Sequence, residues 1–541
     1  MKDISSTGSF VDFTLENFIY VDKTVYIPQL VKLKRVFISR PRRFGKSLTL
    51  DTIATLFETG VEPYFKGTWI YDKWTEPTYP VLRLNFLDLD KYSLEHFKQK
   101  LNAIISSFAR DINVKNYEEK VEPEDTIYFL LDELRKEKRQ IVILIDEYDC
   151  QMTANINNET LYKQFQEKIK SFYANIKDKF AIKFLGITGV TRLKDVSIFS
   201  VGSDINDITN ASAYSQMIGF TRDEIKKYYI DYLKLASSYE NNCSVDDVTD
   251  TQLESMLDMM AQNYDGYCFD EDYEKKVFST WSVNKFFQTM IEKKKVQFGE
   301  YWYDNGGLPS ILVNYLKTHE LNIFEYLDKD KFLKVSSDDF KNPTALTTIN
   351  QNVLMCQTGY LTLRSDLNKT STVALGIPNG EIYKALNRLL ANNIFKGNTD
   401  ITDDYGRSLL EVGTVDDIIN LFNSALNSVS YDNYPIVSES SVQNMLKLYL
   451  LGAHQEVLSE VHEAKGRADL VVNTDNRRIV FEFKYAKNEI EAESKLLDAV
   501  EQIKTRDYGN ILPKKNELIR IAAVFNADPK VRAFTENQIV P

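Results

Sequence analysis

The chain has 541 residues, of which 43% are hydrophobic and 27% are charged, and its formal net charge is −12 at pH 7. This length predicts three or four domains, and the composition, with only 21 Gly and 13 Pro, excludes collagen-like, low-complexity and wholly disordered chains. The 4 His exclude chemistry that needs several histidines, such as a His-rich zinc enzyme. Because the chain is acidic, any contact with nucleic acid requires a local basic patch.

The cysteines and the apolar runs both indicate a cytoplasmic protein. None of the 4 Cys belongs to a C-x-x-C pair, which is typical of reduced thiols. The N-terminal segment lacks the apolar core of a secretory signal. The run IVILI at 141–145 has the length of a buried strand and is far too short to cross a membrane.

The first 230 residues alternate short apolar strands with amphipathic helices. Continuous apolar strands separated by helices predict a parallel sheet that is covered on both faces. We expect strands at 35–39, 79–86, 140–148 and 180–189, with a helix at 46–58 directly after the first of them.

The rest of the chain predicts three further parts. A mainly helical part has helices at 221–236 and 280–294, and a hairpin after a helix near 346–380 is typical of a winged-helix-like module. A compact α/β unit follows, with a helix at 439–454, two strands within 468–486, a helix at 489–505 and a last strand at 518–525. The expected domains are 1–230, 231–345, 346–430 and 431–541.

The segment after the first strand has the features of a phosphate-binding loop. Gly45, Lys46 and Ser47 match the end of G-x-x-x-x-G-K-[ST], although Arg40 stands at the first Gly position. Gly45 would allow close approach of the backbone, Lys46 could reach the β- and γ-phosphates, and Ser47 could bind Mg²⁺. Residues 23–50 hold eight basic side chains and no acidic one. The alternative is a chance turn between a strand and a helix.

Carboxylates at the end of a later strand fit the same nucleotide site. Asp146 and Glu147 follow the apolar strand at 140–148. Asp146 would hold Mg²⁺ and Glu147 would act as the general base toward the attacking water. Taken alone, the pair could equally be carboxylates that cap a loop.

The next strand ends in polar residues that fit two roles equally well. Thr188 or Thr191 could sense the γ-phosphate, and Arg192 could contribute charge to it. The same side chains could instead form local caps at the strand end.

A second set of charged residues lies near the C-terminus. Asp469 is on one strand of a hairpin, and Glu482 and Lys484 are on the next. Since strand side chains alternate, Glu482 and Lys484 share one face while Phe483 enters the opposite core. Asp469 and Glu482 could then share a Mg²⁺, while Lys484 would orient or activate water and offset phosphodiester charge. Alternatively, E-F-K is a strand whose polar residues face solvent.

These motifs together resemble the bacterial AAA-ATPase-like family whose C-terminus carries a PD-(D/E)XK nuclease-like domain. The matching segments are YVDKT (20–24), SRPRRFGKSL (39–48), LIDEYD (144–149) and ITGVTRLKDVSIFS (187–200), followed in order by GFTRDEI, YDGYCF, WSV (281–283), QTGYLTL and GIPNGE. The family has SGLNNL after SIFS, where this chain reads SVGSDIND (200–207). The resemblance implies an α/β multidomain protein with a P-loop core, a helical lid and a restriction-endonuclease-like fold.

The resemblance also implies site residues. It places an acidic residue at Glu439 and a helical Gln near the catalytic Lys at Gln502. The expected catalytic residues are Glu147, Asp469, Glu482, Lys484 and Gln502. The expected nucleotide contacts are Arg42, Arg43, Phe44, Gly45, Lys46, Ser47, Asp146, Thr188 and Arg192, and the expected metal ligands are Ser47, Asp146, Glu439, Asp469 and Glu482.

The function expected from these sites is ATP hydrolysis coupled to a Mg²⁺-dependent nuclease, with ATP and Mg²⁺ as cofactors. The partner is nucleic acid, DNA rather than RNA, and a homo-oligomer is possible. Residues 431–541 carry 15 basic and 17 acidic side chains, so this part is not a basic DNA-binding domain. The alternative is an ATP-dependent switch or assembly platform without nuclease activity, whose nuclease-like domain only binds nucleic acid or a protein.

Overall fold

The computed structural model divides the chain into two compact units, which are described separately. One unit comprises residues 1–321 and 330–382, and the other comprises 322–329 and 383–541. The four expected domain boundaries stay a prediction. The residues described are 1–176, 180–193, 205–302, 310–316, 319, 323–343, 345–369, 371–395, 406–453, 456–463, 466–509 and 517–541.

The first unit is built on a parallel sheet of the described strands in the order β2-β3-β4-β1-β5. Its strands are β1 (Arg35–Ser39), β2 (Val81–Asn85), β3 (Ile141–Asp146), β4 (Ile182–Gly189) and β5 (Asn206–Asp207). The strands expected at 35–39, 79–86, 140–148 and 180–189 are thus confirmed, with small changes at their ends. All five residues of β1 are buried, as expected for a strand covered on both faces.

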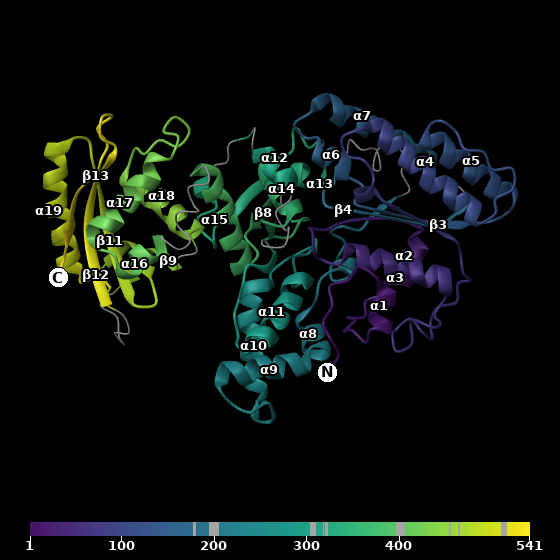
Figure 1. Ribbon diagram of the computed structural model, residues 1–541, viewed down its shortest axis with the longest axis horizontal. Coiled ribbons are helices and arrows are strands. Elements are labelled where there is room, and N and C mark those ends of the chain that lie inside the picture. Colours follow the sequence, from purple (N-terminus) through teal and green to yellow (C-terminus); the bar gives the residue numbers. More distant parts are fainter. Residues whose placement is uncertain are drawn as a thin grey trace. The chain divides into compact units, whose positions relative to one another are not determined.

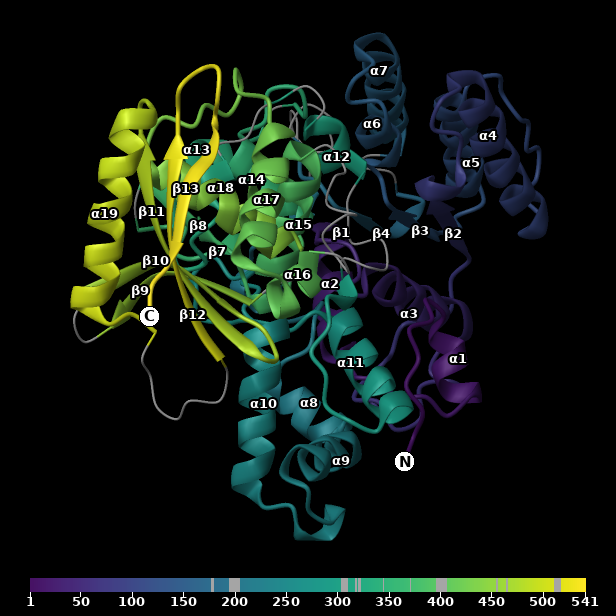
Figure 2. The same cartoon turned by 60° about the vertical axis from the view of Figure 1, so that its left-hand side comes forward.

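Helices lie on both faces of this sheet. Figures 1 and 2 show α2 and α3 on one side of the strands and α4, α5 and α7 on the other. The helices are α1 (Phe10–Leu15), α2 (Ile27–Leu33), α3 (Lys46–Thr59), α4 (Leu94–Asp111), α5 (Pro123–Lys136), α6 (Cys150–Ala154) and α7 (Glu159–Ile176). Because every strand pair is parallel, the carboxyl ends of β1, β3 and β4 meet at one edge of the sheet.

A helical part follows in the same unit. It contains α8 (Arg222–Tyr228), α9 (Ile230–Asn241), α10 (Asp250–Tyr264) and α11 (Thr280–Lys293). The single helix expected at 221–236 is wrong, because the chain breaks at Tyr229. The buried Tyr229 ring stacks on Phe287 at 5.3 Å and its hydroxyl donates to Asn284 Oδ1 at 2.5 Å, so tertiary packing overrides helix propensity here.

A small antiparallel sheet completes the first unit. Its order is β6-β8-β7, formed by β6 (Leu333–Ser336), β7 (Thr362–Leu363) and β8 (Thr372–Gly376). The expected hairpin after a helix is confirmed by α14 (Gln351–Thr358), β7 and β8, and β6 adds a strand to it. The remaining helices are α12 (Ser310–Leu316), α13 (Ser337–Lys341) and α15 (Gly380–Ile394), whose residues from Tyr383 on belong to the second unit.

The second unit has a mixed sheet in the order β13-β12-β11-β10-β9, in which β11 and β12 are parallel and the other described pairs are antiparallel. Figures 1 and 2 show α19 on one face and α17 and α18 on the other. Its elements are α16 (Arg407–Val412), α17 (Val415–Asn427), α18 (Glu439–Gly452), β9 (Glu456–Glu463), β10 (Gly466–Asn473), β11 (Arg477–Ala486), α19 (Glu489–Arg506), β12 (Glu517–Asn526) and β13 (Ala533–Ile539).

Two strands of this sheet were not expected. The expectation that 518–525 forms the last strand is wrong, because β13 follows β12, and β9 precedes the expected hairpin. Both lie at sheet edges, and their sequences, EVLSEVHE and AFTENQI, carry many polar residues. Phe422 of α17 packs against Phe481 at 5.3 Å, so the α17 side of the sheet holds an aromatic core.

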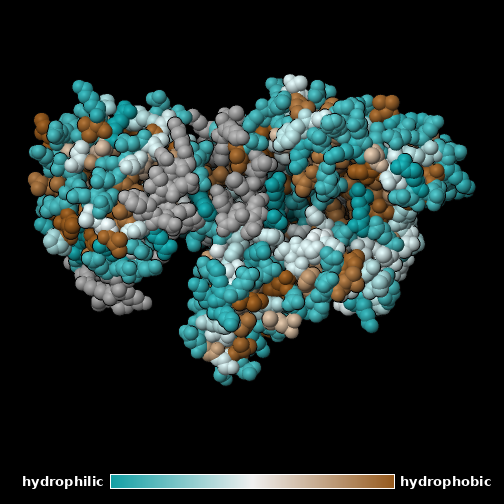
Figure 3. Space-filling view, viewed as in Figure 1, coloured by the Kyte–Doolittle hydropathy of each residue, from teal (hydrophilic) through white to brown (hydrophobic). Residues whose placement is uncertain are grey.

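Hydrophobic side chains are mostly enclosed in both units. On the face shown in Figure 3, hydrophilic residues cover most of the surface and hydrophobic residues lie in small groups between them. The parallel sheet of the first unit and the mixed sheet of the second confirm the expected α/β multidomain fold with a P-loop parallel sheet. Within the described part of the chain, no helix is both long and apolar enough to cross a bilayer.

Candidate functional site

The loop between β1 and α3 has the geometry of a phosphate-binding loop. Gly45 precedes α3 with a φ of 102°, a left-handed conformation that glycine adopts at little cost. Lys46 and Ser47 are the first residues of α3, so their side chains extend from a helix N-terminus that favours anions. Lys46 is 4% exposed, and its Nζ donates to the carbonyls of Arg40 and Pro41 at 3.1 and 3.2 Å.

The end of β3 lies directly beside this loop. Ser47 Oγ donates to Asp146 Oδ2 at 2.6 Å, and the Thr188 hydroxyl donates to Asp146 Oδ1. Glu147 has a φ of 53°, and its Oε1 lies 3.6 Å from Lys46 Nζ. The structure therefore brings together Lys46, Ser47, Asp146, Glu147 and Thr188, which come from three separate strand ends.

Burial changes the ionisation of Glu147. Removal from solvent raises the pKa of this carboxyl group above its usual range, although the nearby Lys46 ammonium opposes the rise. A carboxylate with a raised pKa is a stronger base. Glu147 thus has both the position and the basicity to accept a proton from water near the loop.

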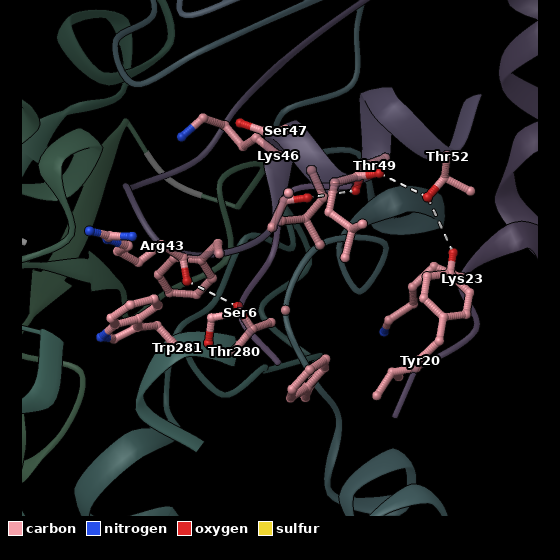
Figure 4. A pocket seen from close by; sticks show the side chains of 18 of the residues that line it. Ser6, Tyr20, Lys23, Arg43, Lys46, Ser47, Thr49, Thr52, Thr280 and Trp281 are labelled. Atoms are coloured by element: carbon pink, nitrogen blue, oxygen red, sulfur yellow. Dashed lines mark hydrogen bonds between the residues drawn. The ribbon is translucent and has the colours of Figure 1, made fainter. Parts of the chain in front are cut away.

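A cavity of about 490 Å³ opens beside the loop, large enough for a nucleotide. Figure 4 shows Lys46 and Ser47 on one side of it and Tyr20 and Lys23 on another. Apolar residues that include Ile19, Val21, Ile27, Leu30, Met217 and Ile218 line part of the wall. The cavity therefore combines a charged end with an apolar wall suited to a base.

Helix α11 contributes to the same cavity. The Thr280 hydroxyl donates to the carbonyl of Arg43 at 3.0 Å, and the Arg43 guanidinium lies 4.2 Å from the centre of the Trp281 ring. Figure 4 shows Arg43 against Trp281. The helical part thus touches the phosphate loop directly, and nothing in the spacing of the sequence could have shown this contact between residues so far apart.

The remaining expected nucleotide residues have other contacts. Arg42 and Phe44 line the cavity, and Phe44 also packs edge-to-face on Tyr267 at 4.7 Å. Arg192 forms an ion pair with Asp207, and it is not among the residues that line the cavity. A contact between Arg192 and a phosphate stays a prediction. Residues 194–204, which include the end of ITGVTRLKDVSIFS and the start of SVGSDIND, lie outside the described residues.

Arg40, which stands where the motif has its first Gly, has a structural position. Its side chain is 1% exposed, lies 4.2 Å from the centre of the Phe269 ring, and donates to the carbonyl of Thr209 at 2.6 Å. Burial lowers the pKa of this guanidinium to about 9. Arg40 therefore connects the start of the loop to Thr209 and Phe269.

The second set of charged residues gathers on one face of the C-terminal sheet. The Leu470–Phe481 pairing of β10 with β11 sets Asp469 opposite Glu482. Lys484 Nζ donates to Glu482 Oε1 at 2.7 Å and to Glu439 Oε1, at the start of α18, at 3.3 Å. Asp469 Oδ2 accepts from the backbone N–H of Phe483 at 2.8 Å. Four of the five residues expected at this site are thus in one group.

Glu482 is a strongly perturbed carboxyl group. Burial and the adjacent Asp469 raise its pKa to about 7, although Lys484 opposes the shift. Its Oε2 is buried and accepts no hydrogen bond from any residue that the structure describes. Burial alone would lower the pKa of Lys484, but the Glu482 carboxylate outweighs this and raises it. Lys484 therefore stays charged at neutral pH.

The fit of this group to a divalent cation is partial. The unsatisfied oxygen of Glu482 is the kind of atom that a cation would complete. However, among the described residues no set of three or more His, Cys, Asp or Glu side chains is close enough to hold a metal. Lys484 Nζ already donates to Glu482 Oε1 and to Glu439 Oε1, so a cation shared by these two oxygens requires this ammonium to move.

Gln502 lies on α19, and its contacts are with a neighbouring tyrosine. Its Nε2 donates to the Tyr508 hydroxyl at 3.3 Å, and Arg506 donates to the same hydroxyl at 3.1 Å. A catalytic role for Gln502 stays a prediction.

Two regions of the chain match models of known families. Residues 5–199 match the family model described as a predicted AAA-ATPase, and residues 437–535 match the PD-(D/E)XK nuclease superfamily. An uncharacterized protein in the vnfD 5′ region of Azotobacter chroococcum mcd 1 is 26% identical over 532 residues, which are 95% of this chain and 94% of that protein.

Solved structures with a similar fold are more distant. The Walker-type ATPase PABY2304 of Pyrococcus abyssi is 11% identical with a TM-score of 0.35, over 67% of this chain and 94% of that one. The Aeropyrum pernix ORC1 protein, solved in complex with DNA, is 10% identical with a TM-score of 0.27, over 71% of this chain and 97% of that one. At these identities and TM-scores neither match bears on function.

Proposed function

From a chain that joins a domain of the predicted AAA-ATPase family to a domain of the PD-(D/E)XK nuclease superfamily, we propose a protein that binds and hydrolyses ATP and couples this to Mg²⁺-dependent cleavage of nucleic acid. The observation that carries the ATPase half is the hydrogen bond between Ser47 and Asp146 at 2.6 Å, beside a cavity of nucleotide size. It joins the two residue types that hold Mg²⁺ in P-loop proteins.

Residues of the loop and of the end of β3 have separate roles in this proposal. Lys46 would exchange its bonds to the loop carbonyls for phosphate oxygens, and the amides at the start of α3 would hold the same phosphates. Glu147 would accept the proton of the attacking water. Mg²⁺, when bound through Ser47 and Asp146, would supply positive charge to the phosphates.

In the proposed hydrolysis of a phosphodiester, the residues of the C-terminal group have different roles. Lys484 stays protonated, so it would offset the charge of the phosphate rather than remove a proton from water. Asp469 and the unsatisfied oxygen of Glu482 are the ligands that would hold Mg²⁺, with Glu439 close by. We favour DNA over RNA as the substrate, and a homo-oligomer remains compatible with this proposal.

The location that we propose is cytoplasmic, on the basis of the thiols. Cys150, Cys243, Cys268 and Cys356 are all free, and two of them are buried. Reduced cysteines are typical of proteins in the cytoplasm.

One observation favours a second candidate. The C-terminal group lacks a ready-made set of three metal ligands among the described residues, and Lys484 is already paired with Glu482 and Glu439. A protein with this arrangement could be an ATP-dependent switch or assembly platform whose nuclease-like domain only binds nucleic acid or a protein.

The ATPase half is tested by nucleotide binding. Titration of the full chain with a fluorescent ATP analogue should show binding that falls at least tenfold in Lys46→Ala, while Lys100→Ala, which removes an exposed lysine of α4, should bind like the wild type. Equal affinity in Lys46→Ala and the wild type would refute the nucleotide site, whatever the outcome for the nuclease.

A further inference from the structure

The basic stretch at 23–50 does not serve the phosphate loop alone. Arg42, Arg43 and Lys46 line the nucleotide cavity at the carboxyl end of β1. Lys32 and Lys34 lie before the amino end of β1, and Arg35 is its first residue. The five residues of β1 separate the two groups by about 13 Å, so the second group cannot act on the same phosphates.

This second group lines a separate cavity of about 740 Å³. It lies at the amino edge of the parallel sheet, because Arg35 begins β1, Ile182 begins β4 and Gln140 directly precedes β3. Lys73, from the segment after α3, and Lys183, from the start of β4, bring the basic residues that line it to five. Residues far apart in sequence therefore converge on one basic cavity.

The positive charge of the cavity is largely uncompensated within its own lining. Glu76 is the acidic residue among the lining residues, and it pairs with Lys183 at 2.6 Å. Lys32, Lys34 and Lys73 are exposed, so their ammonium groups are accessible to a ligand. In a chain with a net charge of −12, this local excess of positive charge is a feature that favours an anionic ligand.

Exposed aromatic rings accompany these lysines. Phe180 lines the cavity and is 64% exposed. Trp69 is 40% exposed, and Lys73 Nζ lies 4.5 Å from the centre of its ring. Lysines that follow a backbone together with exposed rings on which bases stack are the combination used to hold single-stranded nucleic acid.

We propose that this cavity, here called the amino-edge cavity, binds the sugar–phosphate backbone of single-stranded nucleic acid, with a base stacked on Phe180 or Trp69. The flexible lysines, which come from separate segments, suit successive phosphates along a strand better than one free phosphate. The inference rests on the proposed function for its choice of nucleic acid. The amino-edge cavity would supply the basic patch that binding of nucleic acid requires and that residues 431–541 lack.

The test is binding of a fluorescein-labelled single strand of about 20 nucleotides to the full chain, measured by fluorescence anisotropy between about 50 and 200 mM NaCl. EDTA is present and ATP is absent, so neither proposed reaction contributes. The variant combines Lys32→Gln, Lys34→Asn and Lys73→Gln. Asn is chosen at position 34 because the φ of Lys34 is 65°, which Asn adopts more readily than most residues.

Loss of three phosphate contacts should reduce affinity at least tenfold at the lower salt concentration and make the slope of log K against log [salt] shallower by about 2. A matched control replaces Lys100, Lys163 and Lys234, three exposed lysines outside the described lining of the cavity, and should bind like the wild type. Phe180→Ala should weaken binding about fivefold or more with the slope unchanged, because stacking releases no counterions. ATP affinity and thermal unfolding of each variant report on its folding.

Several outcomes would overturn the proposal. The first is no binding of the strand by the wild type, and the second is an equal loss of affinity in the variant and the control. The third is displacement of the strand by saturating ATP, and the fourth is its displacement by pyrophosphate at matched phosphate concentration. The first two deny the site, the third places binding at the phosphate loop, and the fourth assigns the cavity to small phosphates. If the triple variant weakens binding of a duplex as much as it weakens binding of the single strand, the preference for a single strand is wrong. Binding in EDTA, together with no cleavage once Mg²⁺ and ATP are supplied, would count against the nuclease proposal and leave this site intact.

Discussion

Ser47 Oγ donates a hydrogen bond to Asp146 Oδ2 at 2.6 Å, which joins the first turn of α3 to the end of β3. The two residues are 99 positions apart in the sequence. Parallel pairing of β3 with β4 and of β4 with β1 sets their strand ends at the same edge of the sheet. The proposed Mg²⁺ site of the ATPase therefore depends on the order of the strands as much as on the residues.

Asp146→Asn should separate nucleotide binding from hydrolysis. The amide keeps the size of the carboxylate but loses the charge that attracts Mg²⁺. We expect ATP hydrolysis to fall at least about 100-fold, while ATP affinity measured in EDTA changes less than about threefold. Asp132→Asn, at an exposed ion pair on α5, is the matched control. A hydrolysis rate in Asp146→Asn close to that of the control would contradict the metal role.

Glu147→Gln tests the general base. Loss of the proton acceptor should lower kcat by about 10²–10⁴ without weakening ATP binding. Since burial raises the pKa of Glu147, the wild-type rate should rise with pH through a pKa above the usual carboxyl range, because only the deprotonated form accepts the proton. Steady-state rates across pH check this, with Glu159→Gln on α7 as the control. If Glu147→Gln loses ATP binding as well as kcat, Glu147 maintains the structure of the site and is not the general base.

Trp281→Ala tests the contact between α11 and the loop. The Arg43 guanidinium lies 4.2 Å from the centre of the Trp281 ring, a contact worth about 1 kcal/mol. We expect ATP affinity to fall about fivefold in Trp281→Ala and less in Trp281→Phe, which keeps a ring under the guanidinium. Isothermal titration with ATP measures both. If the two variants bind ATP equally well, the ring is not what supports Arg43.

Glu482→Gln should change how stability depends on pH. The folded-state pKa of Glu482, about 7, lies above its unfolded value near 4.5, so the folded state holds the proton more tightly. Stability is therefore greatest below the unfolded pKa and falls as pH rises between the two values, by up to about 3 kcal/mol. The variant should lack this fall. Urea unfolding at pH 5 and pH 8 measures it, and Glu493→Gln, at an exposed position of α19, is the control.

If the free energy of unfolding changes equally between pH 5 and pH 8 in the wild type and in Glu482→Gln, the Glu482 carboxyl group has an ordinary pKa. The same group gives a metal-specific signal. Mg²⁺ or Mn²⁺ bound to Glu482 should release a proton near pH 7, which titration calorimetry in buffers of different ionisation enthalpy detects.

The sequence predicted the buried strands and the motifs at their ends better than it predicted the contacts around them. Period and composition identified β1, β3 and β4, and the motifs at Lys46 and Asp146 followed from local spacing. The edge strands β9 and β13 were missed because their many polar residues obscure the signal of a buried strand. Local pattern identifies elements whose own residues are apolar and periodic.

Long-range contacts were beyond such prediction. Trp281 reaches Arg43, and Lys183 reaches the cavity of Lys32, only through tertiary packing. The pKa of Glu482 also depends on burial and on Asp469 across the sheet. The basic stretch at 23–50 was assigned wholly to the phosphate loop, because the sequence does not show that β1 separates its two halves.

The central claim is that one chain couples ATP hydrolysis to phosphodiester cleavage, and the most direct test is cleavage of labelled DNA by the full chain with Mg²⁺. Wild type and Asp469→Ala are compared, each with and without ATP, and RNA is assayed in parallel. We expect the wild type to cut DNA, faster with ATP, and Asp469→Ala to cut neither substrate. No cleavage by the wild type under any of these conditions, or equal cleavage by Asp469→Ala, would contradict the account.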